Sequence, residues 1–573
     1  MARTLPRNPD LAAQLDLLAD LMELEGADNF RITAYRRAAT RIRETGSSVA
    51  QLALEGRAKE LQGIGKTIEE KIVQAIEDGE MHALTKRKSE VPVEVASFMR
   101  LPGLGPKTAR RLWQELGITT IAALRAAAEA KQLRGLAGIG PKSEEKILAA
   151  LASSLRLSGS EGPRRALLGT TLPKLRAIAA ELSAHPSALQ VSIAGSARRY
   201  RETVRDLDLI ATATDADALL GAFCSAPWVV EVAARGGTKA TVVAQDGLRF
   251  DLRVVPPEAY GNLLQHFTGS KDHNVALREA AVRRGLSVSE YGIAEVETGE
   301  VHAFATEEEV YRFLGYDWIP PELRENCGEL EAARKGELPK LVELADIRGD
   351  LHTHTTWSDG KDTLEAMVAR AVEKGYEYYA ICDHSQRLRG DLLARQTEAI
   401  DALQERVPLR IVKGIEVNIR VDGQLDVSDD DLAAREWVVA SVHSSFDKDA
   451  TGRVLAAMEN PYVSCIGHAT NRKIGKREPA PVDVERVIEK ALETGTFLEI
   501  NSQPDRLDLT DVYARAAREA GLKLVIDSDG HQLSALDYVE LGVGQARRAW
   551  LSKQDVVNTR TWKQIERMRK RPR

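Results

Sequence analysis

The sequence predicts a multidomain protein with a helical N-terminal region, an α+β middle region and a C-terminal barrel of alternating strands and helices. The chain has 573 residues, which is too many for a single hydrophobic core. Up to about residue 155, Ala and Leu recur at helical spacing between short glycine-containing breaks. Short β-rich runs begin at Val191, and from Arg348 such runs alternate with helical segments.

Composition limits the classes to which the protein can belong. A formal net charge of −6 excludes a uniformly basic protein, so any nucleic acid must be bound by local basic faces. The four cysteines lie far apart without a CxxC pair, which argues against a disulfide framework and a zinc knuckle. No apolar run is long enough to cross a membrane, and the N-terminus lacks the apolar centre of a signal peptide. We therefore expect a cytoplasmic protein without a membrane partner.

Changes in composition divide the chain into segments. The polar, Pro- and Gly-containing stretch Ser158–Arg165 and the mixed acidic and basic stretch Pro320–Leu341 are typical of linkers. We predict helical segments at 1–82 and 88–156, two parts of the α+β region at 165–258 and 259–319, a surface linker at 320–345 and the barrel at 346–573.

A glycine-containing phrase occurs three times in the helical region. It reads LQGIGKTIEEKI from Leu61, LPGLGPKTARRL from Leu101 and LAGIGPKSEEKI from Leu136. Because glycine has no side chain, a phosphate can closely approach the backbone N–H groups of such a turn. One copy could be a tight turn between packed helices, but three copies with matching flanks favour binding of a nucleic-acid backbone. The predicted DNA contacts are Gly63, Gly65, Gly103, Gly105, Gly138 and Gly140, with Lys107 and Lys142 as counter-charges.

These phrases resemble helix-hairpin-helix DNA-binding motifs. Together with the basic segment FRITAYRRAATRIR, Phe30–Arg43, the first phrase resembles the N-terminal lyase domain of DNA polymerase beta. The resemblance implies that Lys71 attacks an abasic sugar as a Schiff base and that Tyr35 lies nearby in the DNA-binding face. Segment 1–82 is therefore expected to be lyase-like, and segment 88–156 to form fingers with two further hairpins.

The middle region carries carboxylates that predict a metal site. Asp206 and Asp208 lie two residues apart on a predicted strand, so their side chains point the same way and can share divalent ions. Asp251, in LRFDLRVV, lies at a position on a later predicted strand from which its side chain would reach the same face of the sheet as the third carboxylate. A DxD pair alone would as readily be a surface acidic turn. The distal aspartate and the preceding Gly-Ser pair favour a catalytic metal clamp.

A nucleotide-binding turn precedes this clamp. Gly195 and Ser196 in IAGSARRY can hold a triphosphate through backbone N–H and hydroxyl groups, and Arg198 or Arg199 can neutralise its charge. The arrangement resembles the nucleotidyltransferase superfamily.

The segment HFTGSKDHNVALREAA, His266–Ala281, resembles the YFTGS segment of X-family DNA polymerases, with His266 where many relatives have Tyr. The resemblance implies a nucleotidyltransferase palm at 165–258, a thumb at 259–319 and two-metal nucleotidyl transfer with Mg²⁺ or Mn²⁺. The site residues that it implies are Phe267 and Gly269 at the sugar, Lys271 at the triphosphate, Asn274 at the base and Arg278 at the template minor groove.

A second series of predicted metal ligands is distributed along the C-terminal region. In DLHTHTTWSDG, the histidines alternate along a strand end, and further candidates follow at later strand ends. In a βα barrel these positions converge on one face. One buried histidine would more often be structural, but a series over nearly every strand is not explained that way. The nine predicted ligands are His352, His354, Asp359, His384, Glu416, His443, His468, Asp529 and His531, a set that suits Mn²⁺, Zn²⁺ or Fe²⁺.

This pattern resembles the PHP (polymerase and histidinol phosphatase) domain. The resemblance implies a distorted (β/α)₇ barrel with a cluster of up to three metals, and the complete ligand set implies an active domain. In X-family enzymes that carry it, it implies 3′-5′ exonuclease, 3′-phosphatase and abasic-site endonuclease activities.

The leading hypothesis is a monomeric, nucleoid-associated repair polymerase that uses dNTPs to fill gaps in gapped or nicked DNA and can also process 3′ ends. The alternative is a 3′-end-processing nuclease with weak or no polymerase activity. A nucleotidyltransferase acting on RNA or a small molecule is a third possibility, against which the hairpin repeats and the HFTGS segment both count.

Overall fold

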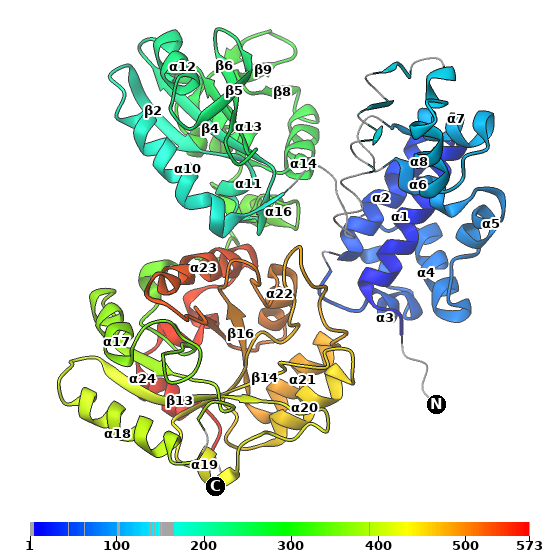
Figure 1. Ribbon diagram of the computed structural model, residues 1–573. Helices are drawn as coiled ribbons and strands as arrows, with labels where there is room; N and C mark the ends of the chain where they lie inside the picture. The colour runs from blue at the N-terminus through cyan, green and yellow to red at the C-terminus, as the bar shows by residue number, and fades with distance from the viewer. Residues whose placement is uncertain are drawn as a thin grey trace. The chain divides into compact units, whose positions relative to one another are not determined.

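The computed structural model describes residues 5–43, 45–61, 63–99, 104–136, 139–141, 144–145, 147–148, 151, 165–388 and 390–571. Three of the predicted DNA contacts, Gly103, Gly138 and Lys142, lie outside the described residues. The chain forms two compact units, Met1–Arg164 and Arg165–Arg573 (Figure 1). Among the described helices, none is both long and apolar enough to cross a membrane.

The first unit is helical, as predicted. Helix α1 (Asn8–Glu25) contacts α2, α5, α6 and α7, and it buries one apolar face that includes Leu11, Leu15 and Leu18. The further helices are α2 (Asn29–Arg43), α3 (Val49–Leu54), η1 (Ala58–Glu60), α4 (Lys66–Asp78), α5 (His82–Glu90), α6 (Val93–Phe98), α7 (Pro106–Leu116), α8 (Ile121–Glu129) and η2 (Leu133–Gly135).

The second unit begins with a five-stranded sheet in the order β2-β4-β7-β6-β5. Alternation along its strands separates two faces. Leu207 and Phe250 pack with α10 and α12 in one core, whereas Asp206 and Asp208 belong to the opposite face. The elements are β1 (Ala166–Leu167), α10 (Leu168–Ser183), β2 (Ala188–Ile193), α11 (Gly195–Arg198), β3 (Thr203–Val204), β4 (Asp206–Ala213), α12 (Ala216–Cys224), β5 (Val229–Arg235), β6 (Lys239–Ala244) and β7 (Arg249–Val254).

A mixed helical and β region follows this sheet. A three-stranded antiparallel sheet packs beside helices, with Leu277, Ile293 and Tyr311 in their common core. The elements are η3 (Pro257–Ala259), α13 (Tyr260–Thr268), α14 (Lys271–Val282), β8 (Leu286–Ser289), β9 (Gly292–Glu295), β10 (Val301–His302) and α15 (Glu307–Phe313).

Residues 320–345 were expected to be a surface linker, and the structure corrects this. The segment contains η4 (Pro321–Leu323) and α16 (Glu329–Lys335), followed by η5 (Leu344–Asp346), and its Leu323 and Leu341 belong to the core just described. Its charges suggested exposure, but Arg324 is fully buried and pairs with Glu307. Pairing of the charged groups therefore allows a charge-rich segment to be buried.

The C-terminal region is the predicted barrel. Seven parallel strands lie in the order β11 to β17, and a bridge between Thr353 and Gly530 connects the first and last, so the barrel is nearly closed. Helices alternate with the strands and surround them (Figure 1). The strands are β11 (Gly349–Asp350), β12 (Tyr378–Ile381), β13 (Arg410–Asn418), β14 (Trp437–Ser441), β15 (Cys465–Ile466), β16 (Phe497–Asn501) and β17 (Leu524–Asp527). The helices are α17 (Leu364–Glu373), α18 (Leu392–Gln404), α19 (Asp429–Ala433), α20 (Ala450–Glu459), α21 (Val484–Thr494), α22 (Asp511–Glu519), η6 (Leu533–Tyr538), α23 (Val539–Arg548), η7 (Lys553–Asp555), η8 (Val557–Thr559) and α24 (Trp562–Met568).

Candidate active sites

Three aspartates meet on the open face of the five-stranded sheet. Strands β4 and β7 pair in parallel, and their register places Asp208 directly opposite Asp251. Asp206 is two residues from Asp208 and therefore on the same face. The pKa of Asp208 is raised to about 6, chiefly by burial and to a smaller extent by the negative charges of Asp251 and Asp206. The three carboxylates repel one another, and divalent cations would relieve that repulsion.

Gly195 lies directly against this carboxylate group. A Cβ atom on Gly195 would lie 2.1 Å from Oδ2 of Asp208, and the residue has a φ of +63°, which disfavours other residues. The amide of Ala194 donates to the carbonyl of Asp208 at 2.9 Å. The start of α11 is thus held at the face that carries the three aspartates, where the sequence predicts a nucleotide-binding turn.

The two arginines after this turn have carboxylate partners. Arg198 binds Glu307 through both terminal nitrogens at 2.8 Å, and Arg199 donates from Nε to Oε1 of Glu325 at 3.0 Å. Arg198 and Arg199 also hold Thr268, through its hydroxyl at 2.8 Å and its carbonyl at 2.7 Å. Each of these carboxylates is shared with a second arginine, Glu307 with Arg324 and Glu325 with Arg548, and the role of Arg199 at a triphosphate stays a prediction.

The HFTGS segment forms the end of α13 and the turn that follows. The amide of Asn274 donates to the carbonyl of His266 at 2.7 Å and accepts from Gln265 at 3.0 Å. A Cβ atom on Gly269 would lie 2.5 Å from Oδ1 of Asn274. Asn274 is buried and braces the turn, and its contact with a base stays a prediction.

The other predicted residues of this segment are more accessible. The guanidinium of Arg253 lies over the ring of Phe267, at 4.2 Å from its centroid. Lys271 is exposed in the first turn of α14, and Arg278 is exposed on the same helix. These two cations are available to an anionic ligand.

In the helical unit, the described residues of the three glycine phrases have features in common. The apolar residues between the glycines, Ile64, Leu104 and Ile139, are all buried. Gly65 and Gly105 precede α4 and α7 without a side-chain cap. A Cβ atom on Gly65, Gly105 or Gly140 would meet no atom within 4 Å among the described residues, so packing does not require glycine there. Gly63 has a φ of +87°, and Lys107 is exposed beside the second turn.

The first and third hairpins also share a buried glutamate that the sequence analysis missed. Glu69 accepts a hydrogen bond from the amide of Lys59 at 3.0 Å, and the equivalent Glu144 pairs with Arg134. Glu69 and Glu144 occupy the same position in the repeated phrase, and this repetition could have predicted a shared structural role. Lys71, on α4, and Tyr35, on α2, are each half-buried.

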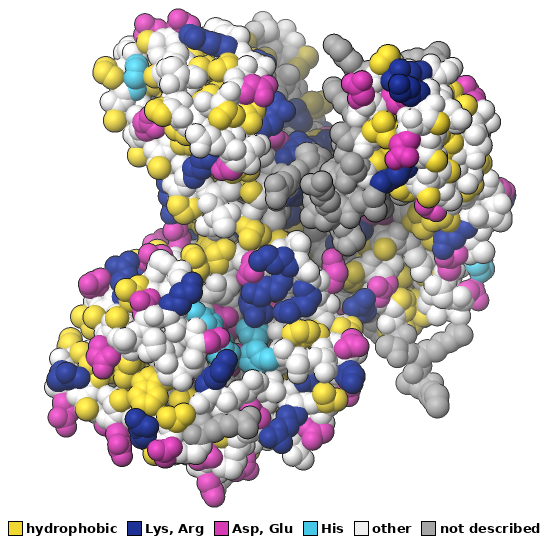
Figure 2. Space-filling model, in the orientation of Figure 1, with side chains coloured by type: hydrophobic (Ala, Val, Ile, Leu, Met, Phe, Trp, Pro, Cys, Tyr) yellow, Lys and Arg dark blue, Asp and Glu magenta, His cyan; other side chains and the backbone are white. Residues whose placement is uncertain are grey.

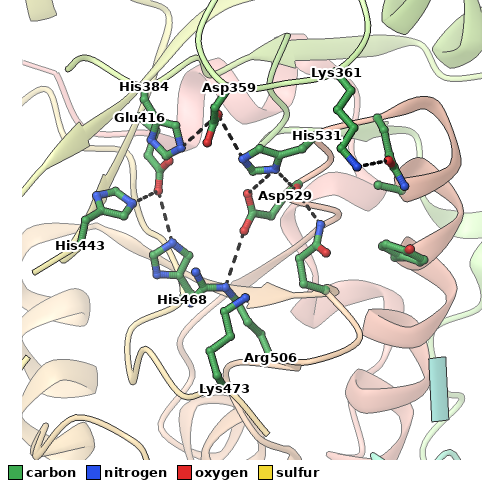
Figure 3. Close-up of a pocket in the computed structure, with 14 residues that line it drawn as sticks. Asp359, Lys361, His384, Glu416, His443, His468, Lys473, Arg506, Asp529 and His531 are labelled. Carbon is green, nitrogen blue, oxygen red and sulfur yellow. Dashed lines mark hydrogen bonds and ion pairs between the residues drawn. The ribbon is translucent and has the colours of Figure 1, made fainter. Parts of the chain in front are cut away.

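The barrel gathers all nine predicted ligands at the carboxyl ends of its strands. Seven of them border a cavity of about 460 Å³ (Figure 3). His352 and His354 are completely buried. The ligand atoms form three groups, in each of which they lie within 4.8 Å of one another. The groups are His354, Asp359, His384 and His531; His352, His354 and Asp529; and His384, Glu416 and His443. His468 joins them at 3.3 Å from Glu416.

The chemistry of these groups fits a metal cluster. Among the described atoms, Nδ1 of His354 is buried without a hydrogen-bond partner. Nε2 of His352, Nε2 of His354 and both carboxylate oxygens of Glu416 contact only other predicted ligands, without an aligned hydrogen bond. Buried polar atoms normally have partners, and metal ions would supply them here. Burial, followed by the charge of His531, lowers the pKa of His354 to about 3, so this imidazole is neutral and able to bind a cation.

Residues around the ligands complete the site, and the sequence analysis missed them. Oε1 of Glu499, on β16, lies 2.6 Å from Nδ1 of His352, and its Oε2 accepts from the amide of His468 at 2.6 Å. Glu499 therefore orients two ligands. Lys361, Lys473 and Arg506 border the cavity, and Lys and Arg side chains surround the histidines on the surface (Figure 2). This basic rim can attract phosphate.

Comparison with known proteins gives four matches to family models. They are the helix-hairpin-helix domain at 6–81, the SAM-like helix-hairpin-helix tandem at 96–153, the DNA polymerase beta thumb at 263–325 and the PHP domain at 350–531. The chain is 39% identical to the DNA polymerase/3′-5′ exonuclease PolX of Bacillus subtilis (strain 168) over 574 residues, covering 98% of this chain and 99% of that protein. The chain belongs to the PolX family.

Other relatives match parts of this PolX-family chain. DNA polymerase lambda of Rattus norvegicus is 24% identical over 348 residues, 56% of each chain. A probable phosphatase of Thermoanaerobacter sp. (strain X514) is 29% identical over 225 residues, covering 37% of this chain and 89% of that protein. The PolX architecture thus combines a polymerase half and a metal-binding half, each with relatives of its own.

Proposed function

We propose that this chain is a DNA-templated, gap-filling repair polymerase that also removes nucleotides from 3′ ends. The observation that carries the polymerase assignment is the register of β4 and β7, which brings Asp206, Asp208 and Asp251 to one face beside the Gly195 turn. The printed name of the Bacillus subtilis relative supports both activities.

In the polymerase half, the three aspartates would hold Mg²⁺ or Mn²⁺, which would acidify the primer 3′-OH and balance the charge of the leaving pyrophosphate. Gly195 and Ser196 receive the triphosphate, because the absence of a side chain at Gly195 lets this turn lie directly against Asp208. Lys271 adds a positive charge. Phe267 and Gly269 lie against the sugar, and Arg278 reaches the template strand. Asn274 supports this surface from behind.

In the barrel, the nine ligands would hold Mn²⁺, Zn²⁺ or Fe²⁺, which would activate the hydrolytic water and stabilise the developing charge. The basic rim binds the phosphate of the DNA end. Lys473 and Arg506 border the cavity on one side and Lys361 on the other (Figure 3). The same arrangement would serve 3′-5′ exonuclease, 3′-phosphatase and abasic-site endonuclease reactions.

The helical unit binds gapped or nicked DNA. Hairpin glycines present backbone N–H groups to phosphates, and Lys107 adds charge. Lys71 would act as the lyase nucleophile, with Tyr35 beside the DNA. We propose that the protein acts as a monomer, in the cytoplasm and associated with the nucleoid.

A 3′-end-processing nuclease with weak polymerase activity is the second candidate. It is favoured by the complete ligand set of the barrel and by the commitment of Arg198 and Arg199 to thumb carboxylates.

Variants of the two sites test the proposal. In Asp208→Ala, we expect dNTP incorporation to fall at least about 10³-fold, because the two-metal site is broken, while exonuclease activity is retained. In His354→Ala, we expect the reverse. Labelled primer strands resolved on a gel measure both activities. Loss of both activities in either variant, with its thermal unfolding unchanged, would show that the sites do not work separately.

A further inference from the structure

We propose that Arg548, a residue of the barrel, positions the nucleotide-binding turn of the polymerase. The inference rests on the polymerase activity proposed above. Arg548 touches no predicted metal ligand and no predicted nucleotide contact other than Arg199, so we assign it a positioning role.

Within the barrel, Arg548 is fixed by Asp511. It lies at the end of α23, and its side chain is only 3% exposed. Its Nε and Nη2 both donate to Oδ2 of Asp511, at 2.9 and 2.6 Å. A guanidinium held on two of its nitrogens has a defined orientation.

The remaining nitrogen of Arg548 reaches out of the barrel. Nη1 donates to the backbone carbonyl of Arg199 at 2.9 Å and to Oε1 of Glu325 at 2.8 Å. The same oxygen of Glu325 accepts from Nε of Arg199 at 3.0 Å. Arg199 is thus held at both its main chain and its side chain. Burial opposes ionisation of Glu325, but the charges of Arg548 and Arg199 hold its pKa at about 2.

This contact is made at the end of the nucleotide-binding turn. Arg199 caps α11, which has only four residues and begins at Gly195. A single helical turn does not hold itself in place, so its position depends on outside contacts. The side chain of Arg199 also donates to the carbonyl of Thr268, which directly precedes Gly269. The guanidinium of Arg548 therefore supports α11 directly, and through Arg199 it supports the turn at Gly269. Both elements are expected to surround the dNTP.

A simpler role for Arg548 would be to join the barrel to the rest of the unit, and Arg547 provides the matched control. Arg547 is adjacent on α23 and binds Glu322 at 2.7 Å and the carbonyl of Val342 at 3.1 Å. It contacts η4 and the segment after α16 but not α11. Loss of Arg547 removes a contact of the same kind without loosening the nucleotide-binding turn.

The test compares wild type, Arg548→Met and Arg547→Met on a duplex with a one-nucleotide gap. KM for the dNTP and kcat are measured together with exonuclease activity on single-stranded DNA and with the thermal midpoint. For Arg548→Met, we expect KM to rise about tenfold, as for the loss of buried hydrogen bonds to a charged group, with exonuclease activity retained. For Arg547→Met, we expect KM within about twofold of wild type.

Equal KM values in the two variants, or a parallel loss of exonuclease activity in Arg548→Met, would overturn the proposal. Should Arg548→Met fail to fold, Arg548→Lys takes its place. A single ammonium cannot make all of these contacts, so KM should rise by a smaller factor, and an unchanged KM would refute the role of Arg548. If wild type itself incorporates no dNTP, the polymerase function fails as well, whereas incorporation that is insensitive to Arg548 refutes only this inference.

Discussion

At the residue scale, the proposed chemistry depends on a few contacts that the alternation of side chains along a strand could predict. It also depends on several contacts that this alternation could not predict. Asp206 and Asp208 could be predicted to share a face because strand side chains alternate. The pairing of Arg199 with Glu325, 126 residues away, could not be predicted. Glu499 was missed because its partner His352 lies 147 residues away, just after β11.

Gly195→Ala tests the approach of the turn to Asp208. The new Cβ atom would collide with Oδ2 of Asp208 and would strain a backbone with positive φ, so we expect dNTP incorporation to fall at least about 10²-fold. Primer extension on gapped DNA measures the effect. Gly237→Ala is the control, because no atom lies within 4 Å of its Cβ position among the described residues. Equal activity in both variants would contradict the geometry of the turn.

Glu499→Gln tests the support of the barrel ligands. The amide cannot act as a negatively charged acceptor for His352, so we expect metal affinity to fall about 10- to 100-fold. Titration of exonuclease activity with Mn²⁺ should show recovery at high concentration. Glu489→Gln, on the exposed face of α21, should behave as wild type. An unchanged Mn²⁺ dependence in Glu499→Gln would be evidence against this role.

At the scale of elements, the sequence predicted the helical region, the sheet and the barrel, because hydrophobic periodicity reports local structure directly. The segment 320–345 was predicted wrongly. Its mixed charges resemble those of a linker, and only the folded chain shows that Arg324 meets Glu307 inside the core.

The hairpin glycines allow a test at this scale. Alanine at Gly65, Gly105 and Gly140 together should change stability by no more than about 1–2 kcal/mol, because their Cβ positions are open. Affinity for gapped DNA should fall at least about tenfold, because the methyl groups would block the approach of phosphate. Fluorescence anisotropy at fixed salt measures binding, and thermal unfolding measures stability. Unchanged DNA affinity would indicate that the hairpins are only turns between helices.

At the scale of the whole molecule, the described chain forms two compact units, and the second contains both predicted metal sites. A buried ion pair between Arg548 and Glu325 connects the barrel to the polymerase half within that unit, and Asp511 holds Arg548 on the barrel side. Sequence motifs predicted the aspartate site and the barrel site independently. Such motifs do not show which surfaces of the two regions pack together.

These ion pairs predict a dependence of stability on pH. The pKa of Glu325 falls from 4.5 to about 2 in the folded chain, so its pairing stabilises the fold above pH 4.5, and this contribution is lost as the pH falls towards 2. Glu325→Gln should lower the thermal midpoint at pH 7 by about 3 °C, and the difference from wild type should shrink below pH 4.5. Glu331→Gln, at an exposed carboxylate of α16, is the control. A difference that stays constant between pH 7 and pH 3 would contradict the ionic role of Glu325.

The most direct test of the central claim uses a duplex with a one-nucleotide gap, Mn²⁺ and a labelled primer strand, with and without dNTPs. A chain that combines a polymerase and a 3′-5′ exonuclease should extend the primer when dNTPs are present and shorten it when they are absent. Shortening under both conditions would support the end-processing nuclease instead. No change under either condition would contradict both activities.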